Sequence, residues 1–115
     1  MAGDRGGYVI KVDGLPSSEN ASTFASHEHG ALVSFFLSHN WPGTGPKLHQ
    51  HPYEETFVVE EGDVLFTVGE RTIEATGGTS LSSRPGFHTS SSAARRRIAR
   101  SGIHPVARME TEWLE

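Results

Sequence analysis

The sequence predicts an all-β fold, and three observations lead to this prediction. Glycine accounts for 13 of the 115 residues, a content typical of chains with many tight turns. The apolar runs are about five residues long, and turn residues separate them roughly every 8–12 positions. No stretch has the longer repeat of an amphipathic helix. We therefore expect a β-barrel or β-sandwich in which residues 1–115 form a single domain.

The first half of the chain is expected to contain two strands. Residues 8–12 form an apolar run that Asp-Gly and a proline end, and a polar connection follows over residues 17–22. Residues 31–39 alternate apolar and polar side chains, which predicts a second strand. Its more apolar face carries Val33, Phe35 and Leu37, although Phe36 makes the other face partly apolar. Residues 41–46 predict a loop, because such a density of proline and glycine breaks strands.

The second half is expected to be a series of strands joined by glycine turns. We predict strands at residues 55–61, 64–68, 71–75, 79–83 and 97–104. Gly69-Glu70 fits a two-residue hairpin loop whose first position has a positive φ, which glycine adopts at little cost. Residues 89–92 predict a loop, and residues 109–115 fit either a helical turn or a strand. The inward-facing core positions would include Phe35, Phe57, Val59, Val64, Phe66 and Val68.

Charge and hydropathy narrow the partners that we expect. The net charge is −4, whereas proteins that bind nucleic acid usually carry an excess of positive charge. The basic run Arg95, Arg96, Arg97 and Arg100 is expected to be a solvated turn and strand end. The N-terminus has no apolar run resembling a signal peptide, and no stretch approaches the length that spans a membrane. We therefore expect no nucleic-acid or membrane partner, and a cytoplasmic location by default.

A cluster of two histidines and a glutamate predicts a metal site. The chain has no cysteine, so any metal must be held by imidazole and carboxylate. His49 and His51 point to the same face of an extended chain, and Glu55 has the same parity beyond Pro52. A lone His-x-His often lies on an exposed strand and binds no metal. Here the adjoining apolar strand and Glu55, which points to the same face, favour metal binding. This ligand set suits one divalent transition-metal ion, namely Fe, Mn, Ni, Zn or Cu.

The spacing of these residues resembles the first motif of the cupin superfamily. That motif is Gly, five residues, His-x-His, three or four residues, Glu, six residues, Gly. Gly43, His49, His51, Glu55 and Gly62 satisfy every spacing. The resemblance implies a double-stranded β-helix, a jelly-roll-like barrel that is usually dimeric, with the metal near its centre.

The second cupin motif is matched less well. It reads Gly, five residues, Pro-x-Gly, two residues, His, three residues, Asn. Gly78 and Gly86 are in place, but Arg84 stands at the proline position and Ser92 where asparagine is expected. His88 arrives one residue early, and the resemblance makes it the expected fourth ligand. The two motifs together span residues 43–92.

The early arrival of His88 leaves two outcomes, because a slip of one residue reverses the face of every side chain on a strand. If a bend or bulge absorbs the slip, His88 joins His49, His51 and Glu55. If not, Phe87 turns inward, and a two-histidine, one-carboxylate face remains. We expect the first outcome.

The resemblance also indicates a function. It implies an enzyme of the dioxygenase or isomerase type that acts on a small, partly apolar, oxygen-containing metabolite at a mononuclear metal. The alternative is a cupin module that binds a small molecule without turning it over. A homodimer is expected, because a short barrel has free strand edges and residues 8–12 could cover one in the partner.

Three further histidines have alternative roles. His39 could point into the barrel and donate a hydrogen bond to a metal ligand, but a satisfied histidine at a strand end is favoured. His27 and His29 form a second His-x-His without a phased carboxylate, so we expect them at the strand surface or in a dimer contact.

Overall fold

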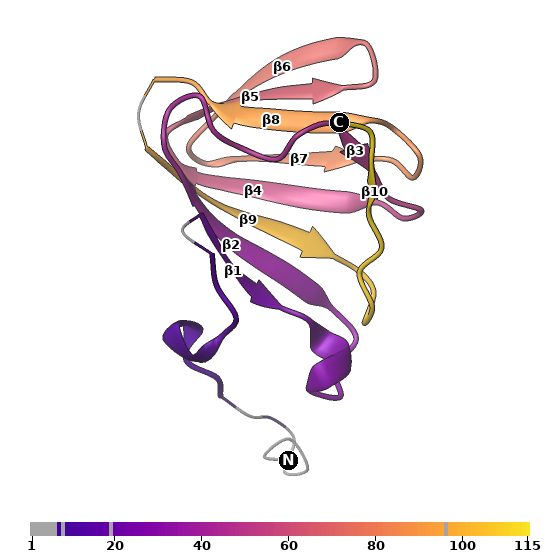
Figure 1. Ribbon diagram of the computed structural model, residues 1–115. Coiled ribbons are helices and arrows are strands. Elements are labelled where there is room, and N and C mark those ends of the chain that lie inside the picture. Colours follow the sequence, from indigo (N-terminus) through magenta and orange to yellow (C-terminus); the bar gives the residue numbers. More distant parts are fainter. Residues whose placement is uncertain (1–6, 8, 19, 96) are drawn as a thin grey trace.

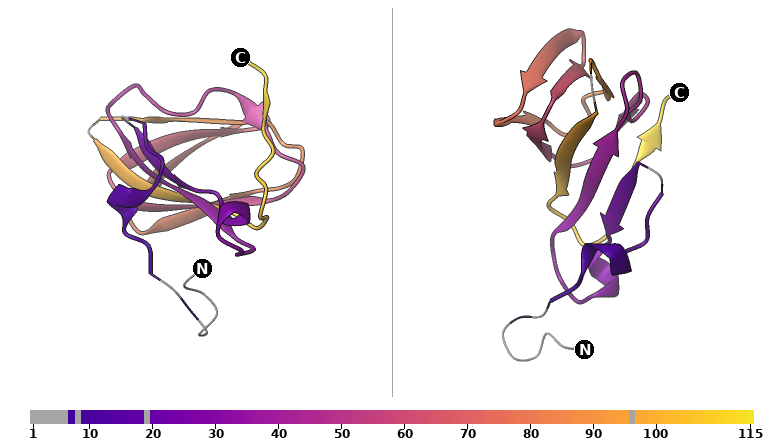
Figure 2. Two further views of the ribbon diagram at one scale, coloured as in Figure 1. Left: turned by 60° about the horizontal axis from the view of Figure 1, so that its bottom comes forward. Right: turned by 90° about the vertical axis from the view of Figure 1, so that its left-hand side faces the viewer.

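Two antiparallel sheets face each other and enclose the interior of the molecule. The computed structural model describes residues 7, 9–18, 20–95 and 97–115. Within these residues the strands form two five-stranded sheets (Figures 1 and 2). The first sheet has the order β1 (Ala21–Phe24), β2 (Ser34–Asn40), β9 (Ile98–His104), β4 (Glu55–Glu61), β7 (Thr79–Ser83). The second has the order β10 (Glu112–Trp113), β3 (His49–Gln50), β8 (Thr89–Ala93), β5 (Asp63–Val68), β6 (Arg71–Thr76).

The all-β prediction is confirmed, and the strands of the second half lie close to their predicted positions. Both β4 and β7 have the predicted bounds, and β5, β6 and β9 differ from prediction by one residue at one end. Between β5 and β6, Gly69 has a φ of 59°, as expected for the first position of the hairpin loop. The glycine turns therefore gave reliable boundaries for these strands.

The predicted strand at residues 8–12 is absent from the described part of that segment, and Tyr8 lies outside the described residues. Residues 9–11 have no regular structure, and a short 3-10 helix, η2, spans Val12–Gly14. A strand needs a partner for its backbone groups, but the edge of β2 is already paired with β1. The strand β1 lies partly in the segment that was predicted to be a polar connection. A second short helix, η3 (Ser26–Glu28), links β1 toward β2.

The prediction of a loop at residues 89–92 is also wrong, because these residues belong to β8. This strand lies between β3 and β5 and pairs with both. Its serines are half-buried, while Thr89 and Ala93 at its two ends are buried. The polar side chains of this segment are typical of a loop, although its backbone pairs with a strand on each side.

The two faces of β2 are reversed relative to prediction. Ser34 and Asn40 are buried, and Phe36 lines the interior. Phe35 instead stacks on Phe24 of β1, with ring centroids 4.9 Å apart. Both faces of the strand have apolar neighbours, so the alternation could not distinguish inside from outside.

The hydrophobic core fills one part of the space between the sheets. Its buried members are Phe57, Val59, Val64, Phe66, Ala75, Ala93 and Ile98. Other inward positions carry polar side chains instead: His49, His51, Glu55, Arg100 and His104 are all buried. This uneven filling leaves a polar pocket inside the barrel. In the described part of the chain, no helix is both long and apolar enough to cross a membrane.

Candidate metal site

The structure brings His49, His51 and Glu55 together in the interior. Each of these residues is at most 6% exposed, and their ligand atoms all lie within 4.8 Å of one another. Glu55 Oε1 is 3.0 Å from His51 Nε2 and 4.0 Å from His49 Nε2. Two imidazoles and a carboxylate therefore meet at one buried point, as the spacing of the sequence predicted.

Strand geometry explains how a short segment delivers both histidines. His49 lies on β3 and pairs with Thr89 of β8 on one side and with Trp113 of β10 on the other. Gln50 points to the opposite face, where its side-chain amide donates to Glu112. The following residue, His51, points inward again, as the two-residue period of an extended chain requires.

The hydrogen bonds of the two rings fix their tautomers. His49 Nδ1 is 2.6 Å from the backbone carbonyl of Lys47, and His51 Nδ1 is 2.6 Å from that of Glu110. A carbonyl oxygen only accepts hydrogen bonds, so each Nδ1 carries a proton and donates it. In the neutral rings each Nε2 then presents a lone pair to Glu55, which is the orientation that metal-binding histidines adopt.

The atoms at the centre of the cluster lack hydrogen-bond partners. His51 Nε2 and Glu55 Oε1 are buried and lie 3.0 Å apart, and neither has a hydrogen-bond partner. Unpaired buried polar atoms are costly. Atoms that converge on a common point, rather than on each other, are what a bound cation would satisfy. The residues present therefore fit a divalent transition-metal ion.

Electrostatics keep Glu55 ionised in this buried position. Burial alone would raise the pKa of Glu55, but contacts with His104 and His51 outweigh it and lower the pKa to about 2. Burial also lowers the pKa of His49, which favours the neutral, coordinating form of that ring. The cluster therefore offers a charged carboxylate beside a neutral imidazole.

A fourth histidine, which the sequence analysis did not assign to the site, lies on β9. His104 is 1% exposed, and its Nε2 is 3.0 Å from Glu55 Oε2. On its other side, Nδ1 is 2.6 Å from the hydroxyl of Tyr53, which accepts a hydrogen bond from the Glu110 amide. No local sequence motif identified it: its place in the interior follows from the inward face of β9, on which positions 98, 100, 102 and 104 are buried.

The structure does not bring His88 to the cluster, which corrects the expected fourth ligand. His88 is exposed in the connection before β8, and Phe87 is 50% exposed. The inward position opposite His49 belongs to Thr89, which is 2% exposed. The slip in the second motif is therefore not absorbed by a bulge, and neither predicted side chain turns inward.

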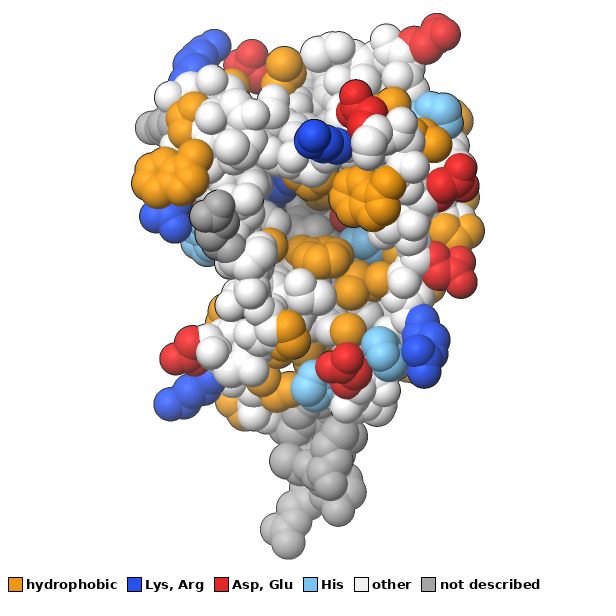
Figure 3. Space-filling model, viewed as in Figure 1, with side chains coloured by type: hydrophobic (Ala, Val, Ile, Leu, Met, Phe, Trp, Pro, Cys, Tyr) orange, Lys and Arg blue, Asp and Glu red, His pale blue; other side chains and the backbone are white. Residues whose placement is uncertain are grey.

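A pocket of about 300 Å³ opens beside the cluster. Figure 3 shows a hollow in the face of the molecule, with hydrophobic and histidine side chains within it. Aromatic side chains form much of its wall: Phe36, Phe57 and Trp113. Its polar lining comprises Asn20, Ser38, Asn40, His49, His51, Glu55, Arg100, His104 and Thr111. The volume suits a small molecule.

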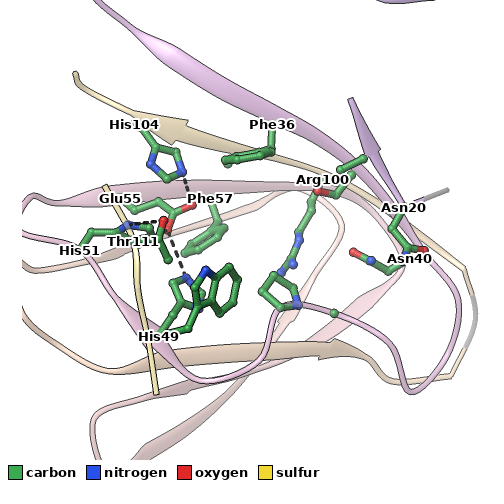
Figure 4. Close-up of a pocket in the computed structure, with 16 residues that line it drawn as sticks. Asn20, Phe36, Asn40, His49, His51, Glu55, Phe57, Arg100, His104 and Thr111 are labelled. Atoms are coloured by element: carbon green, nitrogen blue, oxygen red, sulfur yellow. Dashed lines mark hydrogen bonds and ion pairs between the residues drawn. The ribbon is translucent and has the colours of Figure 1, made fainter. Parts of the chain in front are cut away.

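The basic run does not behave as one solvated segment, because Arg100 lies inside the barrel. Arg95 and Arg97 are exposed, and Arg96 lies outside the described residues. Arg100 is 3% exposed and lines the pocket. Figure 4 shows its side chain between the histidine cluster on the left and Asn40 on the right. The alternation of β9 turned this arginine inward.

The remaining histidines lie away from the cluster. His39 is exposed on β2, which rules out the hydrogen bond to a metal ligand considered above. His27 is in η3, where its Nδ1 is 3.3 Å from the carbonyl oxygen of Ala107. His29 follows η3 and stacks on Phe24. The predicted position on a strand surface is therefore wrong for both residues, and the alternative of a dimer contact stays a prediction.

Comparison with known protein families gives a match to the middle of the chain. A family model described as Cupin domain matches residues 36–89, a segment that includes His49, His51 and Glu55. Comparison with curated proteins gives no match. The matched segment therefore covers the sequence motif and the centre of the site.

Solved structures with the same fold include a stand-alone domain of similar size. An uncharacterized conserved protein with a double-stranded β-helix domain from Klebsiella pneumoniae subsp. pneumoniae MGH 78578 has a TM-score of 0.74 and 16% identity. The alignment covers 95% of this chain and 98% of that chain. At this identity the likeness shows the fold.

Larger proteins contain the same fold as one part of their chains. A Bacillus subtilis oxalate decarboxylase has a TM-score of 0.73 and 16% identity, over 87% of this chain and 29% of that one. The Lactobacillus farciminis oxalate decarboxylase, solved as a formate complex, has a TM-score of 0.76 and 15% identity, over 89% and 34%. This chain therefore spans about a third or less of those enzymes.

Proposed function

A Cupin domain model matches residues 36–89, and from that match we propose that this chain is a cupin that binds one divalent transition-metal ion through His49, His51 and Glu55. We further propose that the metal site serves an enzyme of the dioxygenase or isomerase type. Its substrate would be a small, partly apolar, oxygen-containing metabolite bound in the adjoining pocket.

One observation carries the metal proposal. The Nε2 atoms of His49 and His51 face Glu55 Oε1 because backbone carbonyls fix the opposite ring nitrogens. Of these, His51 Nε2 and Glu55 Oε1 have no hydrogen-bond partner although they are buried. A structural cluster of buried polar residues would be expected to satisfy itself by hydrogen bonds. This cluster is instead arranged as a set of ligands.

The residues around the site suit chemistry on a bound small molecule. A metal ion at this position supplies Lewis-acid chemistry, and a redox-active ion also exchanges electrons. Glu55 and the two imidazoles occupy one side of the site, and the pocket adjoins it. Phe36, Phe57 and Trp113 exclude water from a ligand and orient its apolar part. His104, between Tyr53 and Glu55, is the group best placed to hold or move a proton.

The alternative is a metal-containing module that binds a small molecule without turning it over. One observation favours this alternative: in the described pocket lining, the titratable groups other than the three proposed ligands are only His104 and Arg100. The discriminating measurement is oxygen uptake by the Fe(II)-loaded protein with enolisable or catechol-like compounds. Uptake that depends on His51 favours the enzyme, and binding without uptake or isomerisation favours the module.

Metal analysis tests the site itself. We expect the purified protein to contain close to one transition-metal ion per chain. His51→Ala should lose most of it, because one imidazole is removed and the remaining ligands are opened to water.

His88→Ala is the matched control, since it deletes an exposed histidine that lies outside the cluster. It should retain the metal content of the unaltered protein. Equal metal content in His51→Ala and His88→Ala would contradict the proposed site.

A further inference from the structure

Arg100 is a buried cation without a carboxylate partner. Its side chain is 3% exposed, and among the described residues it forms no ion pair with an acidic group. One guanidinium nitrogen, Nη1, donates to Ser91 Oγ over 2.6 Å. A guanidinium has five N–H donors, so most of its hydrogen-bonding capacity is not used by the described side chains.

The surroundings keep this arginine in place and charged. Its Cζ lies 5.5 Å from the ring centroid of Phe57 and 5.6 Å from that of Phe66, so the cation packs on two aromatic faces. Burial lowers the pKa of Arg100 to about 10, and the charge of Glu55 opposes that shift. The guanidinium therefore remains protonated at neutral pH. A buried charge is costly unless a partner compensates it.

The charges that line the pocket do not balance once a metal is bound. Glu55 is the single acidic residue in the described lining, and Arg100 is the single arginine or lysine. A divalent ion beside one carboxylate leaves a positive charge, to which Arg100 adds another. A pocket with excess positive charge favours an anionic ligand.

Asn40 supplies a second unpaired polar group in the same pocket. It is 4% exposed and lines the pocket together with Arg100, and its Oδ1, which only accepts hydrogen bonds, has no hydrogen-bond partner and therefore suits a donor group of a ligand. Figure 4 shows Asn40 on the far side of Arg100 from the histidines. A polar subsite therefore lies at one part of the pocket and the metal ligands at another, with aromatic walls around the pocket.

We propose that the ligand of this pocket is an organic carboxylate, whose anionic group binds the guanidinium of Arg100. A planar carboxylate matches the guanidinium fork and can accept two hydrogen bonds from it. The apolar body of the ligand lies against the aromatic wall and extends toward the histidine cluster. This inference adds a substrate class to the proposed function. It rests on the proposed function only for the contact between the other end of the ligand and the metal site.

Benzoate and benzamide are the probes that test this inference, because they have nearly the same shape and differ in charge. Binding to the full-length protein is measured by isothermal titration calorimetry, with metal loaded and after metal removal. We expect benzoate to bind at least about 10-fold more tightly than benzamide in both forms, since an ion-paired hydrogen bond is worth a tenfold factor or more. Equal binding of the two probes would overturn the inference.

Substitutions of Arg100 test whether this residue causes the preference for benzoate over benzamide. Arg100→Met keeps an apolar chain of similar length and should remove the preference for benzoate, whereas Arg100→Lys should retain part of it. Arg97→Met is the matched control, because Arg97 is exposed and packs on Trp41 outside the barrel. It should bind both probes as the unaltered protein does. If Arg100→Met does not fold, Ser91→Ala, which removes the partner of Nη1, should still weaken benzoate more than benzamide.

The design separates failure of this inference from failure of the metal proposal. A benzoate preference that depends on Arg100 in the metal-free protein supports the inference, even if the purified chain holds no metal. A preference that requires metal and persists in Arg100→Met would mean that the carboxylate binds the ion, and it would overturn the role of Arg100. That second result would leave the metal site itself intact.

Discussion

At the scale of single residues, Gly102 makes room for the carboxylate of the site. It lies on β9 opposite Phe57 of β4. A Cβ at this position would stand 3.0 Å from Glu55 Oε2 and 3.7 Å from the Phe57 ring. Glycine in the interior of a strand is usually unfavourable relative to alanine. Its presence here is explained by the close approach of Glu55.

Gly102→Ala should therefore weaken metal binding while the fold is kept. The added methyl group displaces the Glu55 carboxylate, and changes next to a metal ligand reduce affinity about 10-fold or more. The midpoint of thermal unfolding of the metal-free protein should not fall, because alanine suits a strand better than glycine does. Metal titration and a thermal melt measure the two effects. Gly14→Ala, where nothing lies within 4 Å of the added atom, is the control, and equal metal affinity in both variants would contradict this role of Gly102.

The buried residues of β9 show why part of the site could not be predicted. His49, His51 and Glu55 come from one short segment, so the two-residue period of an extended chain sufficed to place them on one face. Arg100 and His104 reach the pocket only through the pairing of β9 with β2 and β4. A run of arginines gave no sign of which side chain would face inward. The register of β9 with β2 and β4 determines which of these side chains faces inward.

At the scale of elements, the C-terminal strand β10 acts as a cover that fixes the histidines. It pairs with β3, and Trp113 lies against His49 with ring centroids 5.0 Å apart. The Glu110 carbonyl just before it accepts the hydrogen bond from His51 Nδ1. The sequence left residues 109–115 undecided between a helical turn and a strand, because two paired residues give too short a pattern to read. Their role became visible only in the structure.

Deleting residues 110–115 should lower metal affinity by about 10-fold or more. His51 would lose the acceptor that fixes its tautomer, and His49 would be opened to water. Strand content by circular dichroism should change little, because β10 contributes a single two-residue pairing. Gln50→Ala serves as a control, since it removes only the side-chain hydrogen bond to Glu112 on the outer face. A truncated protein that binds metal as tightly as the full chain would show that β10 has no such role.

At the scale of the whole molecule, the fold class was easier to predict than the strands with polar side chains. Glycine turns and short apolar runs were enough for the all-β class and for β4, β5, β6, β7 and β9. β1 and β8 were missed because their polar side chains, such as Ser90 and Ser92, resemble those of a loop. Their strand character comes from neighbours far away in the sequence, as in the pairing of β8 with β5. Sequence-local patterns do not contain that information.

The sheet edges at β6, β7 and β10 support the prediction of a homodimer. In the described residues, β1 and β7 end one sheet and β10 and β6 end the other, and the outer side of β1 is partly covered by residues 16–18. Exposed edges of this kind favour pairing with a second copy. We predict the mass of a dimer by light scattering at roughly tens of micromolar protein, where assembly depends on protomer concentration. The mass of a single chain across that range would contradict the prediction.

Anomalous X-ray diffraction from crystals of the purified protein tests the central claim most directly, because it locates a transition metal without reference to activity. The account predicts one anomalous peak per chain, roughly 2.0–2.2 Å from His49 Nε2, His51 Nε2 and a Glu55 oxygen. A diffraction pattern with no anomalous peak after loading with Mn, Fe, Ni, Cu and Zn, or a peak bound elsewhere in the chain, would contradict it.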